Sequence, residues 1–526
     1  MPADGRGQRS WPGHMLPVMA DLPPPAAGAP DELSPLDYLL HRGEAYPATR
    51  SAFLDLEVLD QLADWGRLRE AIDRASRVVI RMRQKVVVPP VPTTPPQWVT
   101  DPDFDLDYHL RRIALPGPGT MRQLLDLAEI TLQSPLDTSR ALWEALYVEG
   151  LEGGRSALLM KLSHAITDGL GGVALFQQVY DTERDAAPRP MPLVPVPRDV
   201  TGADLVRSSL QRLPESTFSA GKSLVRAAIT AGRLLGQPGP AVTEAVGFAN
   251  SALRVLGPPP AAPSPLLRGR SLISRTHVLE LPLADLRAAA KSVGASVNDA
   301  YLAALCGGLG QYHEALGVPV EALPLAIPVS LRTGDDPASG NRFAGITIAA
   351  PLSVADPAVR IRLVREQVIA RRNEPAIDVI DRIAPALGLL PDGALQLVTD
   401  RIRPPDIQAS NVPGYAQETF LAGAKVERQY GLGPLPRVAM MAILISRAGT
   451  CTVTFRYDTA SFTATDLLEK CLQAGFDEVV ALGRPAPRPA PRRRAAGTAS
   501  RSATSARRTA ADKPGGASPR RARGTS

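Results

Sequence analysis

The amino-acid sequence predicts a mixed fold class, α/β or α+β, with two domains. Helix-like and strand-like segments are interleaved in both halves of the 526 residues, and 44% of the residues are hydrophobic, enough for one large or two medium cores. A stretch rich in proline and glycine, residues 186–270, separates halves of similar size. We therefore expect a disordered extension at 1–30, an N-terminal domain at 31–185, a linker at 186–270, a C-terminal domain at 271–483 and a disordered basic tail at 484–526.

In the first half, ordered structure is expected to begin at Leu33–Asp37, where a serine and a proline precede an apolar run, as at a helix N-terminus. Apolar residues at helical spacing predict helices at 67–84 and 121–133. Nearly continuous apolar runs predict buried strands at 142–148 and 156–162. Glycines follow the second strand, and further helices are expected at about 173–182 and, inside the linker, at 203–236.

The second half repeats this mixture. Strands are expected at 277–281, 323–330 and 345–352, and helices at 283–293, 297–313, 356–373 and 463–482. Ser296 precedes the second of these helices with an acid three residues later, the pattern of a capping box. Two apolar runs, 438–446 and 450–457, are joined through an Ala-Gly pair and predict a β-hairpin.

The net charge of +6 is unevenly distributed along the chain. Residues 484–526 contain twelve basic residues and one acid, so the other 483 residues are slightly acidic, with a net charge of −5. A folded domain that binds nucleic acid needs its positive patch on the folded surface, so no nucleic-acid partner is expected for the core. The basic tail has three readings that the sequence leaves open: binding to anionic lipid headgroups, binding to RNA, or a solvated extension.

The spacing of the cysteines and the hydropathy of the chain indicate the cellular compartment. The three cysteines are far apart, and neither a zinc site nor a disulfide framework is expected from their spacing. No run approaches the roughly 18 apolar residues of a membrane span. The sequence therefore predicts a cytoplasmic protein, either soluble or peripheral to a membrane, without a metal.

One segment carries a candidate for chemistry: Ser-His-Ala-Ile-Thr-Asp-Gly at 163–169. His164 comes directly after a predicted buried strand, Asp168 lies four residues on, and Gly169 follows. Histidine has the pKa for a general base, which an alcohol needs before it can attack an acyl group. Asp168 has two candidate roles: it holds the turn that presents the histidine, or it pairs with a nearby arginine. Taken alone the motif is weak, because a histidine at a strand end is more often structural.

The motif resembles the active-site signature His-His-x-x-x-Asp-Gly of the wax ester synthase/acyl-CoA:diacylglycerol acyltransferase family. The second histidine, Asp and Gly match, whereas Ser163 stands where the family has its first histidine; serine keeps a hydroxyl but does not titrate. The similarity extends over most of residues 33–482. Further similar blocks, in the family's order, are 33–37, 98–112, 134–144, 296–299, 328–332, 340–341 and 410–414.

The resemblance implies a fold of two chloramphenicol-acetyltransferase-like domains joined by a helical linker, with the catalytic loop in a channel at their interface. It implies an acyl-CoA-dependent O-acyltransferase that moves a fatty acyl group to diacylglycerol, to a fatty alcohol, or to both. His164 would be the general base and acyl-CoA a substrate, with no cofactor. A lipid enzyme of this kind is expected at the inner membrane face or at lipid bodies. Two alternatives remain: a weak or inactive lipid-binding relative, and an acyltransferase of the same fold with another hydroxyl acceptor.

Other residues in the similar blocks each have a structural and a functional interpretation. Asn298 and Asp299 either cap a helix or bring an amide to the active site from the second domain. Asn411 is a candidate oxyanion donor. Weaker candidates for acyl or CoA binding are Leu142, Trp143, Arg332 and Asn341. His109, among Asp105, Asp107, Arg111 and Arg112, is expected to belong to a structural salt-bridge cluster rather than to a catalytic site.

Overall fold

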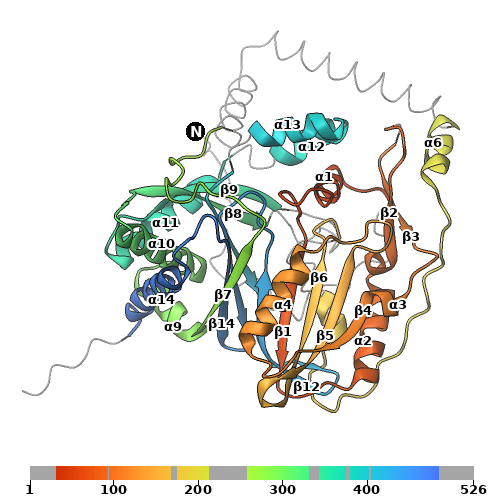
Figure 1. Cartoon of the computed structure of the whole chain (residues 1–526), viewed down its shortest axis with the longest axis horizontal. Helices are drawn as coiled ribbons and strands as arrows, with labels where there is room; N and C mark the ends of the chain where they lie inside the picture. The colour runs from red at the N-terminus through yellow and green to blue at the C-terminus, as the bar shows by residue number, and fades with distance from the viewer. Residues whose placement is uncertain are drawn as a thin grey trace, which may run out of the picture. The chain divides into compact units, whose positions relative to one another are not determined.

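The computed structural model describes residues 31–92, 94–166, 175–211, 257–330, 343–374, 379–401 and 404–484 (Figure 1). All of them belong to one compact unit that ends at Arg484. Within this unit the described residues form two six-stranded sheets and a two-stranded ribbon, with helices packed on the sheets.

The first sheet has the strand order β11-β12-β1-β6-β5-β4. Its strands are β1 Phe53–Leu59, β4 Leu110–Ala114, β5 Trp143–Leu151, β6 Arg155–Leu162, β11 Phe420–Leu421 and β12 Ala424–Leu432. Neighbouring strands are antiparallel except for β4 and β5. Two strands of this sheet, β11 and β12, come from the second half of the chain, so the sheet does not follow chain order. The ribbon consists of β2 Gln84–Val87 and β3 Gln97–Thr100.

The helical segments of the first half are α1 Pro35–Gly43, α2 Trp65–Val78, η2 Ile80–Arg83, α3 Leu106–His109, α4 Met121–Gln133, η3 Glu152–Gly154 and α6 Gly202–Gln211. Side chains satisfy the first backbone amides of several of them, as helix N-termini require. Ser34 accepts from the Asp37 amide at the start of α1, as the sequence predicts, and Thr120 forms a capping box with Gln123 at the start of α4.

The second sheet has the order β7-β14-β13-β10-β8-β9. Its strands are β7 Ser274–Pro282, β8 Ala322–Ser330, β9 Phe343–Pro351, β10 Ile407–Pro413, β13 Met440–Arg447 and β14 Thr450–Asp458. Strand β10 runs parallel to both of its neighbours, and the other pairs are antiparallel. The predicted hairpin is confirmed: Ala448 and Gly449, both at positive φ, connect β13 to β14, as a tight hairpin turn requires.

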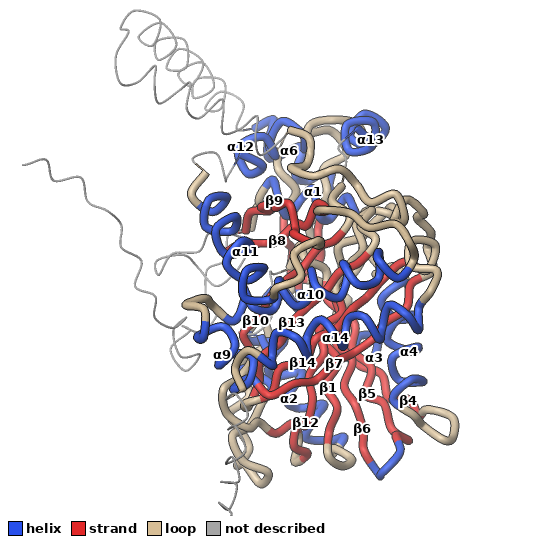
Figure 2. The backbone as a smooth tube through the Cα atoms, turned by 90° about the vertical axis from the view of Figure 1, so that its left-hand side faces the viewer, coloured by secondary structure: helices blue, strands red, loops and turns tan. Residues whose placement is uncertain are grey.

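Helices α9 Leu283–Ser292, α10 Val297–Ala315, α11 Pro357–Arg372 and α14 Thr465–Ala481 accompany the second sheet, and α10 and α14 lie side by side across it (Figure 2). Two further helices are α12 Val379–Gly388 and α13 Asp392–Arg401. The capping box predicted at the start of α10 is present between Ser296 and Asp299. Gly308 of α10 and Gly475 of α14 allow the helix backbones to touch, because a Cβ on Gly475 would lie 2.5 Å from the Ala304 oxygen.

Each sheet has its own hydrophobic core, and a small third cluster lies between the sheets: Met441, Ile443 and Ile445, all on one face of β13. Strand β12 passes these side chains closely. A Cβ at Gly433 would lie 2.7 Å from Met441 Cγ, and one at Gly431 would lie 3.1 Å from Ile445 Cδ1. The glycines therefore let the two sheets approach at β12 and β13.

Most predicted elements exist, with shifted ends. Helix α2 begins at Trp65 and ends at Val78 rather than covering 67–84, because a 3₁₀ turn and strand β2 take up the rest. Of the helix predicted at 173–182, residues 175–179 are helical, and of that at 203–236 the structure describes α6. The sequence did not predict several other elements: β1, β2, β3, β4, β10, β11, β12, α3, α12 and α13. The predicted extension 1–30 and all but Arg484 of the predicted tail lie outside the described residues.

Candidate active site

His164 lies where the sequence places it, directly after the buried strand β6. The last residue of that strand, Leu162, pairs with Phe53 on one side and with Trp143 on the other. The amide of Ser163 then donates to the Leu142 carbonyl (3.0 Å), so the chain stays pinned to β5 for one residue beyond the strand. His164 follows as a half-buried side chain at the strand end.

The ring of His164 has a defined tautomer. Its Nδ1 is hydrogen-bonded to the main-chain oxygen of Ser51, in the segment that leads into β1. A carbonyl oxygen only accepts, so Nδ1 carries the proton and the lone pair of the neutral ring is on Nε2. Phe53 packs edge-on against the ring, with centroids 4.7 Å apart and planes at 72°. One nitrogen is thus fixed by the protein while the other keeps basic character, the arrangement that a general base needs.

Glu44 is a buried carboxyl group behind this histidine that the sequence analysis did not identify. Its Oε1 accepts from the amide of Ser51 (3.2 Å), from the hydroxyl of Ser51 (2.9 Å) and from the hydroxyl of Ser163 (3.3 Å). Ser163 in turn accepts from the amide of Ala165 (3.2 Å). The same carboxyl oxygen therefore holds both the residue that contacts His164 and the residue that precedes it.

Burial raises the pKa of Glu44 above its ordinary value, opposed by the hydrogen bonds from Ser51 and Ser163 and by the charge of Lys161. Lys161 is itself buried, and that burial lowers its pKa. Its Nζ donates to the oxygen of Ser134 (2.6 Å) and pairs with Glu144 (2.9 Å). The protein interior near the histidine therefore contains two acidic residues, Glu44 and Glu144, and one basic residue, Lys161.

Of the other predicted site residues, Leu142 and Trp143 lie beside the end of β6, which leads to this histidine. Leu142 supplies the carbonyl that binds Ser163, and Trp143 pairs with Leu162 and donates its indole N–H to the Met82 oxygen (2.8 Å). Both are buried in the first core. Four predicted residues lie outside the described part of the structure: Asp168, Gly169, Arg332 and Asn341.

Three predicted residues belong to the second sheet and its helices. Asp299 is taken up by the capping box of α10 and by an ion pair with Arg365 (3.1 Å), so its helix-capping interpretation is confirmed. Asn298 is half-buried in the first turn of the same helix. Asn411 lies on β10 opposite Leu444 of β13. The side chains of Ile443 and Ile445, the neighbours of Leu444 along β13, lie on the opposite face of the sheet. Asn411 therefore shares the other face of the sheet, which faces the second core.

His109 has a structural environment, but the predicted salt-bridge cluster around it is wrong. Its charged neighbours pair with residues elsewhere: Asp107 with Arg69, Arg111 with Glu144 and Arg112 with Glu149. His109 itself is fully buried, with Nδ1 2.7 Å from the Trp143 oxygen and its ring stacked on Trp143 (4.7 Å). Burial lowers the pKa of His109, which favours the neutral ring. Charge spacing in the sequence cannot reveal such an aromatic stack.

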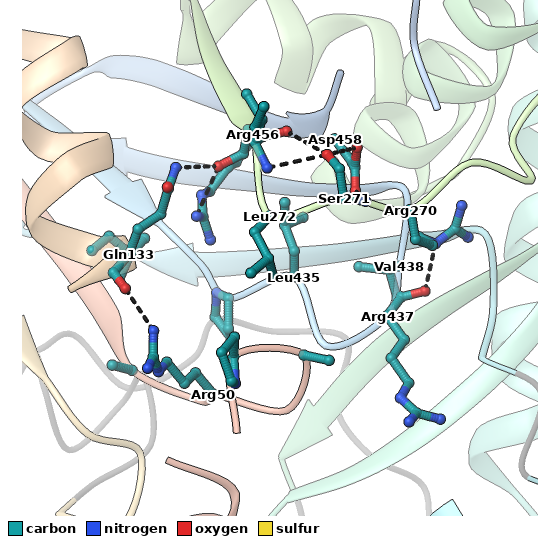
Figure 3. A pocket seen from close by; sticks show the side chains of 17 residues that line it. Arg50, Gln133, Arg270, Ser271, Leu272, Leu435, Arg437, Val438, Arg456 and Asp458 are labelled. Carbon is teal, nitrogen blue, oxygen red and sulfur yellow. Dashed lines mark hydrogen bonds between the residues drawn. The ribbon is translucent and has the colours of Figure 1, made fainter. Parts of the chain in front are cut away.

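A cavity of about 240 Å³ adjoins the segment that holds His164 (Figure 3). Arg50 and Ala52 line it, and Ser51, whose carbonyl binds the histidine, lies between them. The cavity is smaller than the 300–1,000 Å³ of typical ligand sites, so it holds at most part of a lipid substrate. The remaining lining comes from the segment between α1 and β1, the end of α4, the residues that lead into β7, the loop between β12 and β13, and β14: Pro47, Ala48, Leu132, Gln133, Arg270, Ser271, Leu272, Ile273, Ser274, Pro434, Leu435, Arg437, Val438, Arg456 and Asp458.

The described residues contain no group of three or more histidine, cysteine or acidic side chains that could hold a metal ion. In the same part of the chain, no helix combines the length and apolar character of a membrane span. The three cysteines are buried and unbridged, and burial raises the pKa of Cys306 and Cys451 to about 12. Their thiols are therefore poor nucleophiles at neutral pH.

The two sheet-based halves form a chloramphenicol-acetyltransferase-like fold. Matches to two family models define the class as an acyltransferase. Residues 29–301 match the wax ester synthase/diacylglycerol acyltransferase catalytic domain, and residues 339–479 match the C-terminal domain of the same family. The chain belongs to this family.

Among its relatives, a Mycobacterium tuberculosis H37Rv protein named as a putative diacylglycerol O-acyltransferase is 53% identical over 463 residues, covering 88% of this chain and 94% of the relative. A second protein of that strain with the same type of name is 27% identical and covers 77% and 87% of the two chains.

Solved structures share the fold at low sequence identity. The wax ester synthase/diacylglycerol acyltransferase of Marinobacter aquaeolei VT8 is 18% identical, with a TM-score of 0.57 over 86% of this chain and 99% of that one. The first condensation domain of a calcium-dependent antibiotic synthetase is 15% identical, with a TM-score of 0.56 over 87% and 97%.

Proposed function

We propose that this protein transfers a fatty acyl group from acyl-CoA to a lipid hydroxyl, with His164 as the general base. The acceptor is diacylglycerol, a fatty alcohol, or both, and the products are triacylglycerol or wax ester. The observation that carries the proposal is the fixed tautomer of His164, with Nδ1 bound to the Ser51 oxygen at the end of a buried strand. Family membership supplies the acyltransferase chemistry.

In the proposed reaction, Nε2 of His164 takes the proton of the acceptor hydroxyl as its oxygen attacks the thioester carbonyl. The tetrahedral intermediate collapses, the carbon–sulfur bond breaks, and the imidazolium returns the proton to the departing thiolate, so that ester and free CoA leave. This route requires neither a covalent acyl-enzyme nor a cofactor. A hydrogen-bond donor to the oxyanion would contribute about 3 kcal/mol. Asn411 is our candidate donor, although its face of β10 makes it a weak one.

The remaining predicted roles stay proposals. Asp168 and Gly169 would shape the turn after His164, Asn298 would approach from the second half, and Leu142 and Trp143 would border the acyl chain. Arg332 and Asn341 would contact CoA. Since the substrates are lipids, we propose that the protein works at the inner membrane face or at lipid bodies in the cytoplasm.

The test is release of CoA thiol from palmitoyl-CoA by the full-length chain, with hexadecanol, with diacylglycerol and without acceptor. We expect acceptor-dependent release with at least one of the two alcohols. His164→Ala should lower that rate by at least 100-fold without a change in the circular dichroism spectrum, because no other described base replaces Nε2. His277→Gln, which changes a histidine of β7 paired with Glu469, is the matched control.

If His164→Ala turns over substrate at the wild-type rate, the general-base role of His164 is refuted but the acyltransferase activity is not. The absence of thiol release with every acceptor would favour a different function, that of a lipid-binding relative whose site decayed. The observation that supports this second candidate function is that Ser163 replaces the family's first histidine.

A further inference from the structure

We propose that Glu44 is a positioning residue for His164 and acts through the main chain of Ser51. The proposal rests on the proposed function, in which Nε2 of His164 is the base. Glu44 Oε1 binds both the amide and the hydroxyl of Ser51, and the oxygen of Ser51 binds Nδ1 of the histidine. A chain of hydrogen bonds therefore runs from a buried carboxyl group to the imidazole ring.

Glu44 also fixes the catalytic loop from its other side. Its Oε1 accepts from Ser163, the residue before the histidine, and Ser163 holds the amide of Ala165, the residue after it. Position 163 is where the family signature has its first histidine, and in this chain a serine hydroxyl stands there and donates to a buried carboxyl group. Orientation of the base then depends on a residue that lies 119 positions from Ser163 in the sequence.

The carboxyl group is itself held firmly enough to act as an anchor. Glu44 is 3% exposed and follows the last turn of α1, where its amide donates to the His41 oxygen (3.2 Å). Its own carbonyl accepts from Nε of Arg50 (3.3 Å), which also donates to the oxygen of Gln133 (2.7 Å). Three separate parts of the chain thus keep this residue in place: α1, the segment before β1 and the end of α4.

The three hydrogen bonds to the carboxyl group all use Oε1, whereas Oε2 is buried and has no hydrogen-bond partner among the described residues. This asymmetry makes glutamine an informative replacement. Glu44→Gln keeps an oxygen acceptor for Ser51 and Ser163 but removes the negative charge, whereas Glu44→Ala removes the acceptor as well. The pair of variants separates the geometric from the electrostatic contribution.

The experiment measures two properties of the full-length protein, turnover of palmitoyl-CoA and the pH dependence of His164 carbethoxylation by diethylpyrocarbonate, read by peptide mass spectrometry. The second property needs no turnover. Glu44→Ala should lower kcat by about 10- to 100-fold with little change in KM, the usual effect of losing a residue that orients a functional group. Glu44→Gln should keep most of kcat but lower the pKa of His164 by about half a pH unit, since a carboxylate near an imidazole favours the imidazolium.

Glu144→Gln is the matched control, because Glu144 is a half-buried carboxylate that pairs with Lys161 but makes no hydrogen bond to Ser51 or Ser163 in the described structure. It should leave the His164 titration and kcat at wild-type values. A folded Glu44→Ala with wild-type kcat and titration would overturn the proposal, and so would equal effects of Glu144→Gln. If Glu44→Ala does not fold, Glu44→Met takes its place, because methionine is of similar size and also lacks the oxygen acceptor, and wild-type kcat and titration in a folded Glu44→Met overturn the proposal. An inactive wild-type protein with a shifted titration would instead refute the proposed function alone.

Discussion

Asp55 and Glu57 are two acidic residues on one face of β1, both buried where the first sheet meets the second. Asp55 accepts from Nε2 of Gln429 (3.1 Å), whereas neither oxygen of Glu57 has a hydrogen-bond partner. Burial raises the pKa of Asp55 to about 7, although Gln429 and the charge of Arg447 oppose it. Burial and the neighbouring Asp55 raise the pKa of Glu57 well above its ordinary value, against Arg447. Each carboxyl group therefore binds a proton more tightly in the folded chain than in the unfolded one.

This difference predicts how stability depends on pH. Between about pH 4 and 7 the folded protein keeps protons that the unfolded chain has released, so the stabilising contribution is fully present below pH 4 and is lost as the pH rises through 7. In the Asp55→Asn variant the side chain at position 55 is an amide, which does not titrate in this pH range. The variant's free energy of unfolding, from urea titrations, should therefore fall less between pH 5 and pH 8 than that of the wild type, by about 1–2 kcal/mol.

Asp60→Asn is a control for this pH effect. Asp60 comes just after β1 and is held by Arg184 and by the amide of Lys425 (2.8 Å); these contacts outweigh burial and lower its pKa. Folding therefore shifts its proton affinity in the opposite direction, so Asp60→Asn should not flatten the pH dependence. A wild-type slope in Asp55→Asn would show that Asp55 is ionised in the folded protein at pH 5.

For single residues, the sequence predicts sites formed by consecutive residues but not contacts between residues far apart in the sequence. His164 can be predicted because the strand, the histidine and the glycines are consecutive, and because the surrounding blocks resemble a family. Glu44 and Ser51 cannot be predicted, since Ser51 contacts His164 across 113 residues, Glu44 contacts Ser163 across 119 residues, and neither belongs to a motif. Strand β1 is missed for a related reason: its two acidic residues are depleted in strands in general, and only the neighbouring β12 and β13 explain their burial.

Among the elements, α10 and α14 are predicted as helices, but their close crossing is not. Gly475 lies inside α14, where alanine would ordinarily be favoured by about 1 kcal/mol. A Cβ there would meet the backbone of Gly308 and the oxygen of Ala304. Contact with a backbone cannot be relieved by a side-chain rotation, so the clash should outweigh the helix propensity. A helical sequence pattern shows which residues face inward but not how closely two helices approach.

We therefore predict that Gly475→Ala lowers the free energy of unfolding by about 1–3 kcal/mol, the usual cost of overpacking a core. Gly393→Ala provides the comparison, since Gly393 lies in α13 and a Cβ there would meet nothing within 4 Å. That substitution should be neutral or slightly stabilising. Thermal unfolding followed by circular dichroism measures both, and equal melting temperatures for the two variants would contradict the inferred backbone contact.

On the scale of the whole described unit, a buried ion pair joins the halves of the chain. Glu129 of α4 accepts from Nε of Arg456 on β14 (3.1 Å) and from the hydroxyl of Ser274 at the start of β7 (2.6 Å). Both charged side chains are less than 10% exposed. Although burial alone would raise it, Arg456 and the hydroxyls of Ser274 and Thr276 hold the pKa of Glu129 below its ordinary value. A sequence pattern cannot predict this pair, because its members are 327 residues apart.

Removing one partner of a buried pair leaves an uncompensated charge, which costs about 3–5 kcal/mol. Arg456→Met should therefore destabilise the protein by this amount, and Glu129→Gln in addition should recover part of the loss. Asp126→Asn, which breaks an exposed pair with Arg122 on the same helix, should change stability by less than about 1 kcal/mol. Urea unfolding of the wild type, Arg456→Met, Glu129→Gln and the double variant gives the coupling energy directly, and Asp126→Asn is measured beside them.

The same variants show whether the two halves unfold together. All four tryptophans precede residue 150, and the three described ones, Trp65, Trp98 and Trp143, lie in the first half. Arg456 lies in the second half. Tryptophan fluorescence therefore responds to Arg456→Met only if the lost stability of the second half also destabilises the first half. Since Arg456 binds α4 through Glu129, we expect fluorescence and circular dichroism to shift to the same lower urea midpoint. An unchanged fluorescence midpoint beside a shifted circular dichroism signal would mean that each sheet is stable without the other.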